Sequence, residues 1–254
     1  MAGDVFDGRI VPGGIGRSPT GRQEREGDVS TTVESGRLEH EQQTKVTGMP
    51  APADPAPLGL AGFALTTFLL SAKNAGWTHG TDAWLGYAFA YGGLVQLLAG
   101  MWEFRNRNVF GATAFSTYGG FWIGLGLYVK LVAPTAQNGS QVSNDLAWIL
   151  LAFLIFNSYM LLWSLWTNWA VFGVFLTLEV TELVLVIGNF NENSNAVKAG
   201  GVIGVITAAV AWYTSAAGVI NGMVGRSLLP VGSPPAGNVG RAAPAVTPQP
   251  VPQR

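Results

Sequence analysis

The sequence contains 254 residues, of which 48% are hydrophobic and only 11% are charged, less than half of the roughly 25% charged content typical of soluble domains. The net charge of −1 gives no basis for a nucleic-acid partner, and the absence of cysteine excludes disulfides, zinc–thiolate sites, iron–sulfur clusters and thiol nucleophiles. Fifteen of the 29 charged residues lie in the first 54 positions, which indicates a membrane protein with a polar tail.

Two tails flank the apolar part of the chain. Residues 1–53 are rich in Gly, Ser, Arg and Glu without apolar periodicity, and we predict a mostly disordered cytoplasmic N-terminal tail. Residues 232–254 are mainly Pro, Ala, Gly and Val, and we predict a second loose cytoplasmic tail there. The segment between them, residues 54–231, is the predicted transmembrane domain.

The first apolar segment starts with two prolines and two glycines, in the run DPAPLGLAGF. Asp54 is the predicted N-cap, and Pro55 suits the first helical position because its missing N–H would be unpaired there. Pro57 and Gly59 reduce the side-chain bulk of the first turns, which we expect to leave backbone N–H groups accessible. The alternative is an ordinary helix start with packing glycines.

Six apolar segments lie between the tails, most of them near the roughly 20 residues that cross a ~30 Å hydrocarbon core. We therefore predict an all-α membrane protein with six transmembrane helices. Eleven of the 14 Lys and Arg residues fall on the side of the tails, so both termini are predicted to be cytoplasmic. The segments are approximately residues 58–71, 85–102, 109–132, 146–166, 170–188 and 199–218.

Polar side chains inside the predicted spans are candidates for a solute path, because they are costly in hydrocarbon unless they face protein or water. No Lys or Arg lies mid-span, so the polar groups of the spans are hydroxyls, amides, carboxyl groups and backbone groups. We expect these groups to line a wet cavity, with hydrogen bonding between helices as the alternative. The candidate path and anion-donor residues are Thr66, Gln96, Glu103, Asn108, Thr113 and Ser116.

Two acidic residues, Glu179 and Glu182, lie three positions apart midway along the fifth span, on neighbouring faces of one helix. Two carboxylates in that setting repel each other and lose hydration, so we expect at least one to be protonated near neutral pH. They are candidates for proton coupling. The alternative is a neutral acid that makes a hydrogen bond between helices or between subunits.

Residues for enzyme chemistry are scarce. The two histidines, His40 and His79, lie in the tail and in a loop, which leaves no pair for a haem and no cluster for a metal. No mid-span lysine is available for a retinal Schiff base. We therefore predict a protein that is not an enzyme and that needs no cofactor or metal.

Four stretches, DPAPLGLAGF, AGMWEFRNRNVFGATAFSTYGGFW, IGNF and GRSLLPVG, occur in this order between Asp54 and about Gly232. Together they resemble the acetate uptake transporter family, the succinate–acetate permeases also called the GPR1/FUN34/YaaH family. The resemblance implies a six-helix subunit in a homo-hexamer of the plasma (inner) membrane. Each subunit would carry its own path for acetate, with succinate and other small carboxylates as further substrates.

The resemblance also implies a constriction, whose positions match Phe63, Tyr118 and Leu178. The chain departs from the family pattern at Asp54, where Asn is usual, and in the fifth helix, which is usually apolar where the two glutamates stand. Fixed negative charge beside an anion path would oppose acetate, so we expect the acids to be neutral or to point away.

Two questions stay open from the sequence. Transport could follow an anion-channel or a proton-symport mechanism. A non-transporting membrane sensor or scaffold, acting through its cytoplasmic tails, is the alternative to transport.

Overall fold

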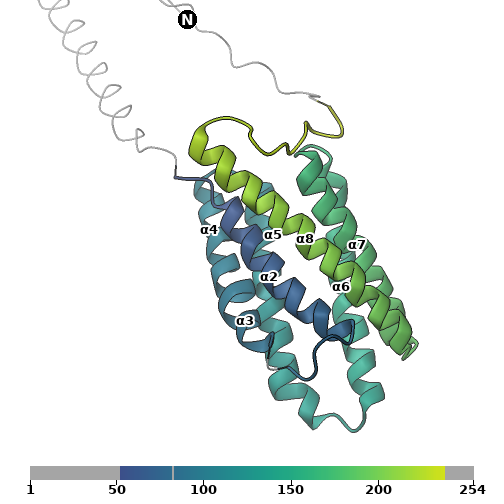
Figure 1. Cartoon of the computed structure of the whole chain (residues 1–254). Coiled ribbons are helices and arrows are strands. Elements are labelled where there is room, and N and C mark those ends of the chain that lie inside the picture. Colours follow the sequence, from purple (N-terminus) through teal and green to yellow (C-terminus); the bar gives the residue numbers. More distant parts are fainter. Residues whose placement is uncertain (1–51, 82, 238–254) are drawn as a thin grey trace, which may run out of the picture. The chain divides into compact units, whose positions relative to one another are not determined.

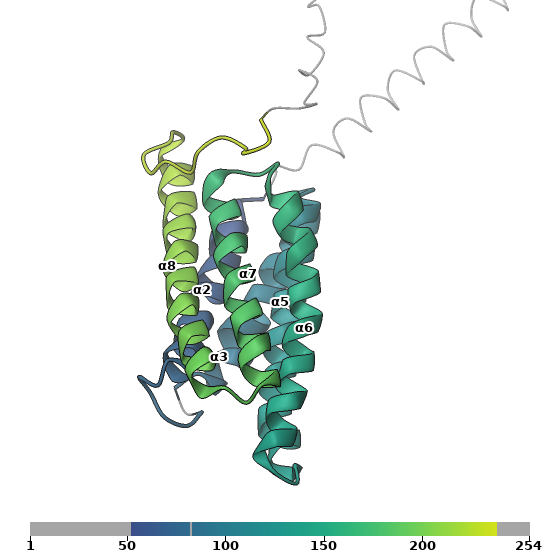
Figure 2. The same cartoon turned by 90° about the vertical axis from the view of Figure 1, so that its right-hand side faces the viewer.

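The computed structural model describes residues 52–81 and 83–237, which belong to one compact unit, Ala51–Arg254. Its described part is a bundle of six helical rods (Figures 1 and 2). The second and third rods each include a π-helical stretch. The rods are α2 (Ala56–Asn74); α3 (Leu85–Phe89), η2 (Ala90–Val95) and α4 (Gln96–Arg105) in succession; α5 (Val109–Leu127) followed by η3 (Tyr128–Val132); α6 (Gly139–Ser164); α7 (Trp169–Phe190); and α8 (Ser194–Val224).

Each of the six predicted apolar segments corresponds to one of the six rods of the described residues, but several helices begin earlier than hydropathy predicts. They begin earlier because their first turns are polar and are capped by an Asn side chain. The Asn138 side chain accepts a hydrogen bond from the Gln141 N–H at 2.9 Å, so α6 starts two turns before its apolar stretch. Of the described helices, α2, α6, α7 and α8 are each long and apolar enough to cross a membrane.

Helix α2 occupies the middle of the bundle. It packs against α8 on one side and against η2 and α4 on the other, while α5 packs on α4 and α7 lies between α6 and α8 (Figures 1 and 2). Small residues allow the close approach of α2 and α8. A Cβ atom on Gly218 would lie 2.7 Å from Cγ of Pro57, and one on Gly201 would lie 2.7 Å from the carbonyl carbon of Asn74.

The start of α2 differs from the prediction. The helix begins at Ala56 with Pro55 as N-cap, although the Asp54 carboxylate does accept the Ala56 N–H at 3.0 Å. The N–H groups of Leu58 and Gly59 both donate to the Pro55 carbonyl at 3.1 Å, and the two prolines have no N–H. The prediction of accessible backbone donors is therefore wrong, because every N–H group in this described first turn already has an acceptor.

The glycine and the second proline at this helix start serve close packing instead. Gly59 is buried, and a Cβ atom there would lie 2.7 Å from the Phe115 ring of α5. The Pro57 carbonyl accepts a hydrogen bond from the Ser215 hydroxyl of α8 at 2.6 Å. The start of α2 is thus fixed against two neighbouring helices.

The described residues after α8 run back over the junction between α6 and α7. The Ala170 N–H donates to the Val231 carbonyl at 3.0 Å, and the Ala236 N–H donates to the Leu165 carbonyl at 2.9 Å. The first residues of the predicted C-terminal tail therefore contact the bundle. The rest of that tail, and the N-terminal tail up to residue 51, lie outside the described residues.

Candidate functional site

Two cavities lie between α2, α5 and α7, which all begin at the same end of the bundle. The larger, of about 50 Å³, lies toward the far ends of these helices, and the smaller, of about 30 Å³, lies toward their starts. Both are roomy enough for water. The larger is lined by Phe63, Thr67, Leu70, Ser71, Asn74, Tyr118, Phe121, Trp122, Leu150, Leu178, Thr181, Glu182 and Leu185, and the smaller by Leu60, Phe63, Gln96, Ala114, Phe115, Tyr118, Val174, Phe175 and Leu178.

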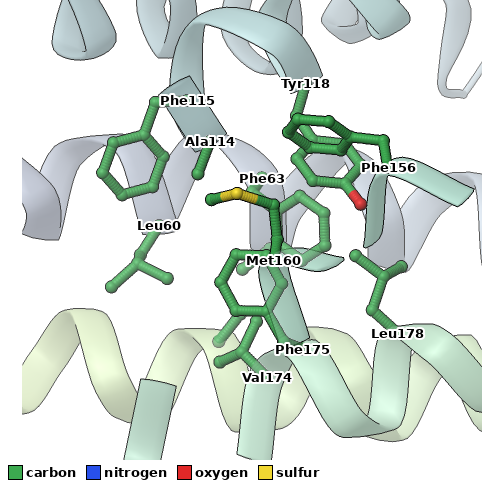
Figure 3. Packing of buried hydrophobic residues seen from close by; sticks show 12 residues of the cluster. Leu60, Phe63, Ala114, Phe115, Tyr118, Phe156, Met160, Val174, Phe175 and Leu178 are labelled. Carbon is green, nitrogen blue, oxygen red and sulfur yellow. The ribbon is translucent and has the colours of Figure 1, made fainter. Parts of the chain in front are cut away.

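Among the described residues, three side chains line both cavities: Phe63 on α2, Tyr118 on α5 and Leu178 on α7. They are 5%, 4% and 6% exposed, respectively. The rings of Phe63 and Tyr118 meet edge to face with their centroids 5.7 Å apart, and Figure 3 shows both within the cluster that also holds Leu178. The structure therefore brings the three predicted constriction residues together, between the cavities.

The Tyr118 hydroxyl is the polar part of this group. Its oxygen lies 3.0 Å from Oδ1 of Asn157 on α6 and 3.4 Å from Oε1 of Glu182 on α7. Asn157 is fully buried, and its Nδ2 donates to the Phe175 carbonyl at 3.1 Å. The hydroxyl thus links the aromatic narrowing to polar groups on two further helices.

The two glutamates of α7 have different surroundings. Glu179 is half-buried and turns toward α6, where its two oxygens accept hydrogen bonds from Asn157 Nδ2 and Ser158 Oγ, both at 2.7 Å. Glu182 is buried and lines the larger cavity, and its Oε2 has no hydrogen-bond partner among the described residues. Glu179 lines neither cavity and so points away from both, whereas Glu182 meets the expectation only as a neutral acid.

Gln96 is the one predicted polar-path residue that lines a cavity in the described part of the chain. It is 1% exposed, it borders the smaller cavity, and its Oε1 has no partner there. Thr66, by contrast, is fully buried and donates its hydroxyl to the Gly62 carbonyl of its own helix at 3.1 Å. Its hydroxyl is therefore not available to an anion.

None of the other four predicted path residues borders either cavity, and three of them, Glu103, Asn108 and Ser116, lie around the contact of α4 with α5. Asn108 is the N-cap of α5 and accepts the Gly111 N–H at 3.1 Å, so its role is structural. Glu103 is fully buried and accepts from the Asn106 amide at 3.3 Å. Thr113 is partly buried.

Ser116 belongs to the same contact, because a Cβ atom on Gly100 of α4 would collide with its hydroxyl. Glu103 and Ser116 therefore fit the alternative reading, in which polar groups join helices, better than the reading of a wet cavity.

Asn157 is the site residue that sequence reasoning missed. It stands in the apolar run LLAFLIFNSYMLLWS of the fourth predicted span. A lone amide in such a run is costly without a partner, and this cost was the signal available in the sequence. In residues 52–81 and 83–237, no group of three His, Cys, Asp or Glu side chains is placed to hold a metal ion.

A sequence profile described as the GPR1/FUN34/yaaH family matches residues 38–231 of the chain. The chain belongs to the GPR1/FUN34/YaaH family. Several proteins whose names describe an activity are similar to this chain.

One relative is "Acetate permease A" of Emericella nidulans, which is 41% identical over 207 residues, 75% of this chain and 69% of the permease. Another is "Succinate-acetate/proton symporter SatP" of Escherichia coli K12, 35% identical over 193 residues, 71% of this chain and 95% of the symporter. A solved structure described as that of the bacterial acetate channel SatP matches with a TM-score of 0.66 at 35% identity. It covers 71% of this chain and 99% of that one.

Proposed function

We propose that this family member transports acetate and related small carboxylates, succinate among them, across the plasma (inner) membrane. The path runs through each subunit and is narrowed by Phe63, Tyr118 and Leu178. The observation that carries the proposal is that these three side chains lie between two cavities enclosed by α2, α5 and α7. The choice of substrate is supported by the names of the similar fungal permease and bacterial symporter.

The lining of the two cavities suits a small carboxylate with an apolar end. It is mostly hydrophobic and offers polar groups on either side of the narrowing, with Gln96 in the smaller cavity and Thr67, Ser71 and Asn74 in the larger. Amide and hydroxyl groups can replace part of the hydration of a carboxylate. The apolar narrowing accepts a methyl group and resists larger or strongly hydrated solutes.

The proposed assembly is a homo-hexamer in which the six rods cross the bilayer and both termini face the cytoplasm. Large apolar side chains on the outside of the rods, such as Leu98, Ile155 and Ile206, are about half exposed, which suits contact with lipid or with a neighbouring subunit. The orientation is testable because the chain has no natural cysteine. A Ser227→Cys variant should react with a membrane-impermeant thiol reagent from the cytoplasmic side only.

Glu179 and Glu182 remain the proton-coupling candidates. A symport mechanism requires acetate uptake to depend on a proton gradient, and Glu182→Gln, which cannot ionise, should then weaken that dependence. A channel mechanism predicts uptake that follows the acetate gradient alone. Glu182 is the stronger candidate because it lines the larger cavity, whereas Glu179 does not.

Uptake of labelled acetate by liposomes that contain only the purified protein tests the proposed function. We expect saturable uptake above that of protein-free liposomes, reduced by unlabelled succinate. A sensor or scaffold that acts through its tails would give uptake equal to that of protein-free liposomes, and this result would refute the transport proposal.

A further inference from the structure

We propose that Asn157 and Glu182 are positioning residues that fix the Tyr118 ring across the path through hydrogen bonds to its hydroxyl. Glu182 makes its hydrogen bond only when its carboxyl group carries a proton. The inference rests on the proposed function, because it concerns the same narrowing. It assigns the fixed position of the Tyr118 ring, and hence the size selection, to two residues that act through that ring.

The first step is the orientation of the Asn157 amide. Its Nδ2 lies 3.1 Å from the Phe175 main-chain carbonyl oxygen, which can only accept a hydrogen bond. The amide nitrogen must therefore face that carbonyl, and Oδ1 must face the Tyr118 hydroxyl, 3.0 Å away. Because Oδ1 cannot donate, the Tyr118 hydroxyl donates its single proton to Asn157.

The second step concerns the contact between Tyr118 and Glu182, whose Oε1 lies 3.4 Å from the Tyr118 hydroxyl oxygen. With the hydroxyl proton already donated to Asn157, an ionised Glu182 would face a lone pair with no proton between them. A protonated Glu182 can donate to the Tyr118 oxygen instead. The Glu182–Tyr118–Asn157 chain is thus fully paired only when Glu182 carries a proton.

The surroundings of the two acids support this assignment. Both oxygens of Glu179 have polar neighbours at 2.7 Å, Nδ2 of Asn157 and Oγ of Ser158. For Glu182, Oε1 lies near the Tyr118 hydroxyl and Oε2 has no hydrogen-bond partner among the described residues, which is a poor environment for a buried charge. A neutral Glu182 fits these surroundings better than an ionised one.

No cationic side chain lies mid-span on the helices that pack around Glu182 in the described structure. The ionisable neighbours of Glu182 are Tyr118 on α5 and Glu179 on its own helix. Helix α2 lines the same cavity with hydroxyl and amide groups, and α8 contributes Thr207, which pairs with the Thr181 hydroxyl. Since no Lys or Arg stands mid-span in α2, α5, α6, α7 or α8, proton loss leaves the Glu182 charge unbalanced.

Loss of that proton removes one of the two hydrogen bonds that fix the Tyr118 ring. The ring can then move more freely, and we expect larger carboxylates to pass more easily relative to acetate. A ratio of acetate to butyrate uptake reports this change. The two anions have equal charge and nearly equal acidity, so direct repulsion by Glu182 cancels in the ratio once the uptake of each by protein-free liposomes has been subtracted.

The test measures that ratio in proteoliposomes with the same pH on both sides, between about pH 5 and about pH 8, where folded proteins are generally most stable. For the natural chain we expect the ratio to fall roughly fivefold once Glu182 has lost its proton, about the factor that one net hydrogen bond provides. Glu182→Gln keeps a donor that cannot ionise, so its ratio should stay at the low-pH value of the natural chain throughout. Tyr118→Phe keeps the ring without its hydroxyl and should give a low ratio at every pH.

Asn157→Ala should also lower the ratio at every pH. Two control variants should retain the natural pH profile: Glu192→Gln, an exposed carboxylate in a loop, and Ser164→Ala, a buried hydroxyl of α6 that bonds only its own helix in the described structure. A pH profile of Glu182→Gln identical to that of the natural chain would overturn the inference, as would a ratio that Tyr118→Phe leaves unchanged. Those outcomes leave acetate transport intact, whereas no uptake by the natural chain would refute the proposed function and the inference together.

Discussion

Tyr118 is fixed both by its ring and by its hydroxyl. The ring lies edge to face against Phe63, Phe121 and Phe156, with centroid distances of 5.7, 6.3 and 5.5 Å. Such aromatic pairs are each worth roughly 0.5–1.5 kcal/mol beyond the area that they bury. The hydroxyl adds the contacts to Asn157 and to α7. A ring held in this way can define the width of a narrow path.

Removal of the ring should therefore widen the path. In Tyr118→Ala we expect the two cavities to merge and the uptake of butyrate to rise relative to that of acetate, at a cost in stability of roughly 3–5 kcal/mol. The measurement is uptake of both solutes into proteoliposomes. Tyr87→Ala, which changes an exposed tyrosine, is the matched control. An unchanged size profile in Tyr118→Ala would remove Tyr118 from the narrowing.

At the scale of elements, the contact of α2 with α8 supports the site, because α2 carries Phe63. The two helices approach so closely that a Cβ atom on Gly201 would lie 2.7 Å from the main-chain carbonyl carbon of Asn74. A main-chain atom cannot rotate away as a side chain can. The position of α2, and with it the position of Phe63, therefore depends on the absence of a side chain at this point of α8.

Gly201→Ala should destabilise the protein. The substitution gains roughly 1 kcal/mol of helix propensity, but overpacking against a rigid main chain costs about 1–3 kcal/mol, so the net effect is a loss. Gly222→Ala on the same helix is the control, since a Cβ atom there would meet no described atom within 4 Å, and it should be neutral or stabilising. Thermal unfolding in detergent measures both. A higher melting temperature for Gly201→Ala than for the unchanged protein would contradict the packing argument.

The order and spacing of the helices could be predicted from the sequence, because each has an apolar stretch that composition alone reveals. The helix starts were harder, since polar first turns capped by Asn carry no hydropathy signal. Asn108 illustrates the difficulty: its side chain could have been read as a cap, and a polar residue near a span end was interpreted as part of a path. The prediction of accessible N–H groups after Pro55 was wrong because the carbonyl of that proline accepts two of them.

The site could be predicted only in part, for a related reason. The family resemblance indicated Phe63, Tyr118 and Leu178, and the structure places all three together. The link from Tyr118 through Asn157 to Glu179 joins three helices, and residues 39 and 22 positions apart meet in it. Such contacts depend on how α5, α6 and α7 pack, which no local pattern of residues encodes.

At the scale of the whole molecule, we propose one path along each subunit with a single narrow point. The two cavities lie on opposite sides of that point, and α2, α5 and α7, which line both of them, begin at the same end of the bundle. On this proposal a solute that crosses passes between Phe63, Tyr118 and Leu178. Bulk added at this point should therefore stop transport, while equal bulk added elsewhere should not.

The most direct measurement is acetate uptake by Leu178→Trp, compared with Leu176→Trp, whose side chain is exposed on the same helix. Both variants should be purified at the same oligomeric size as the natural chain before reconstitution, because overpacking at Leu178 costs about 1–3 kcal/mol. We expect Leu178→Trp to reduce uptake at least about tenfold, a barrier increase of roughly 1.4 kcal/mol, while Leu176→Trp stays near the natural rate. Equal uptake by the two variants would refute the proposed narrow point.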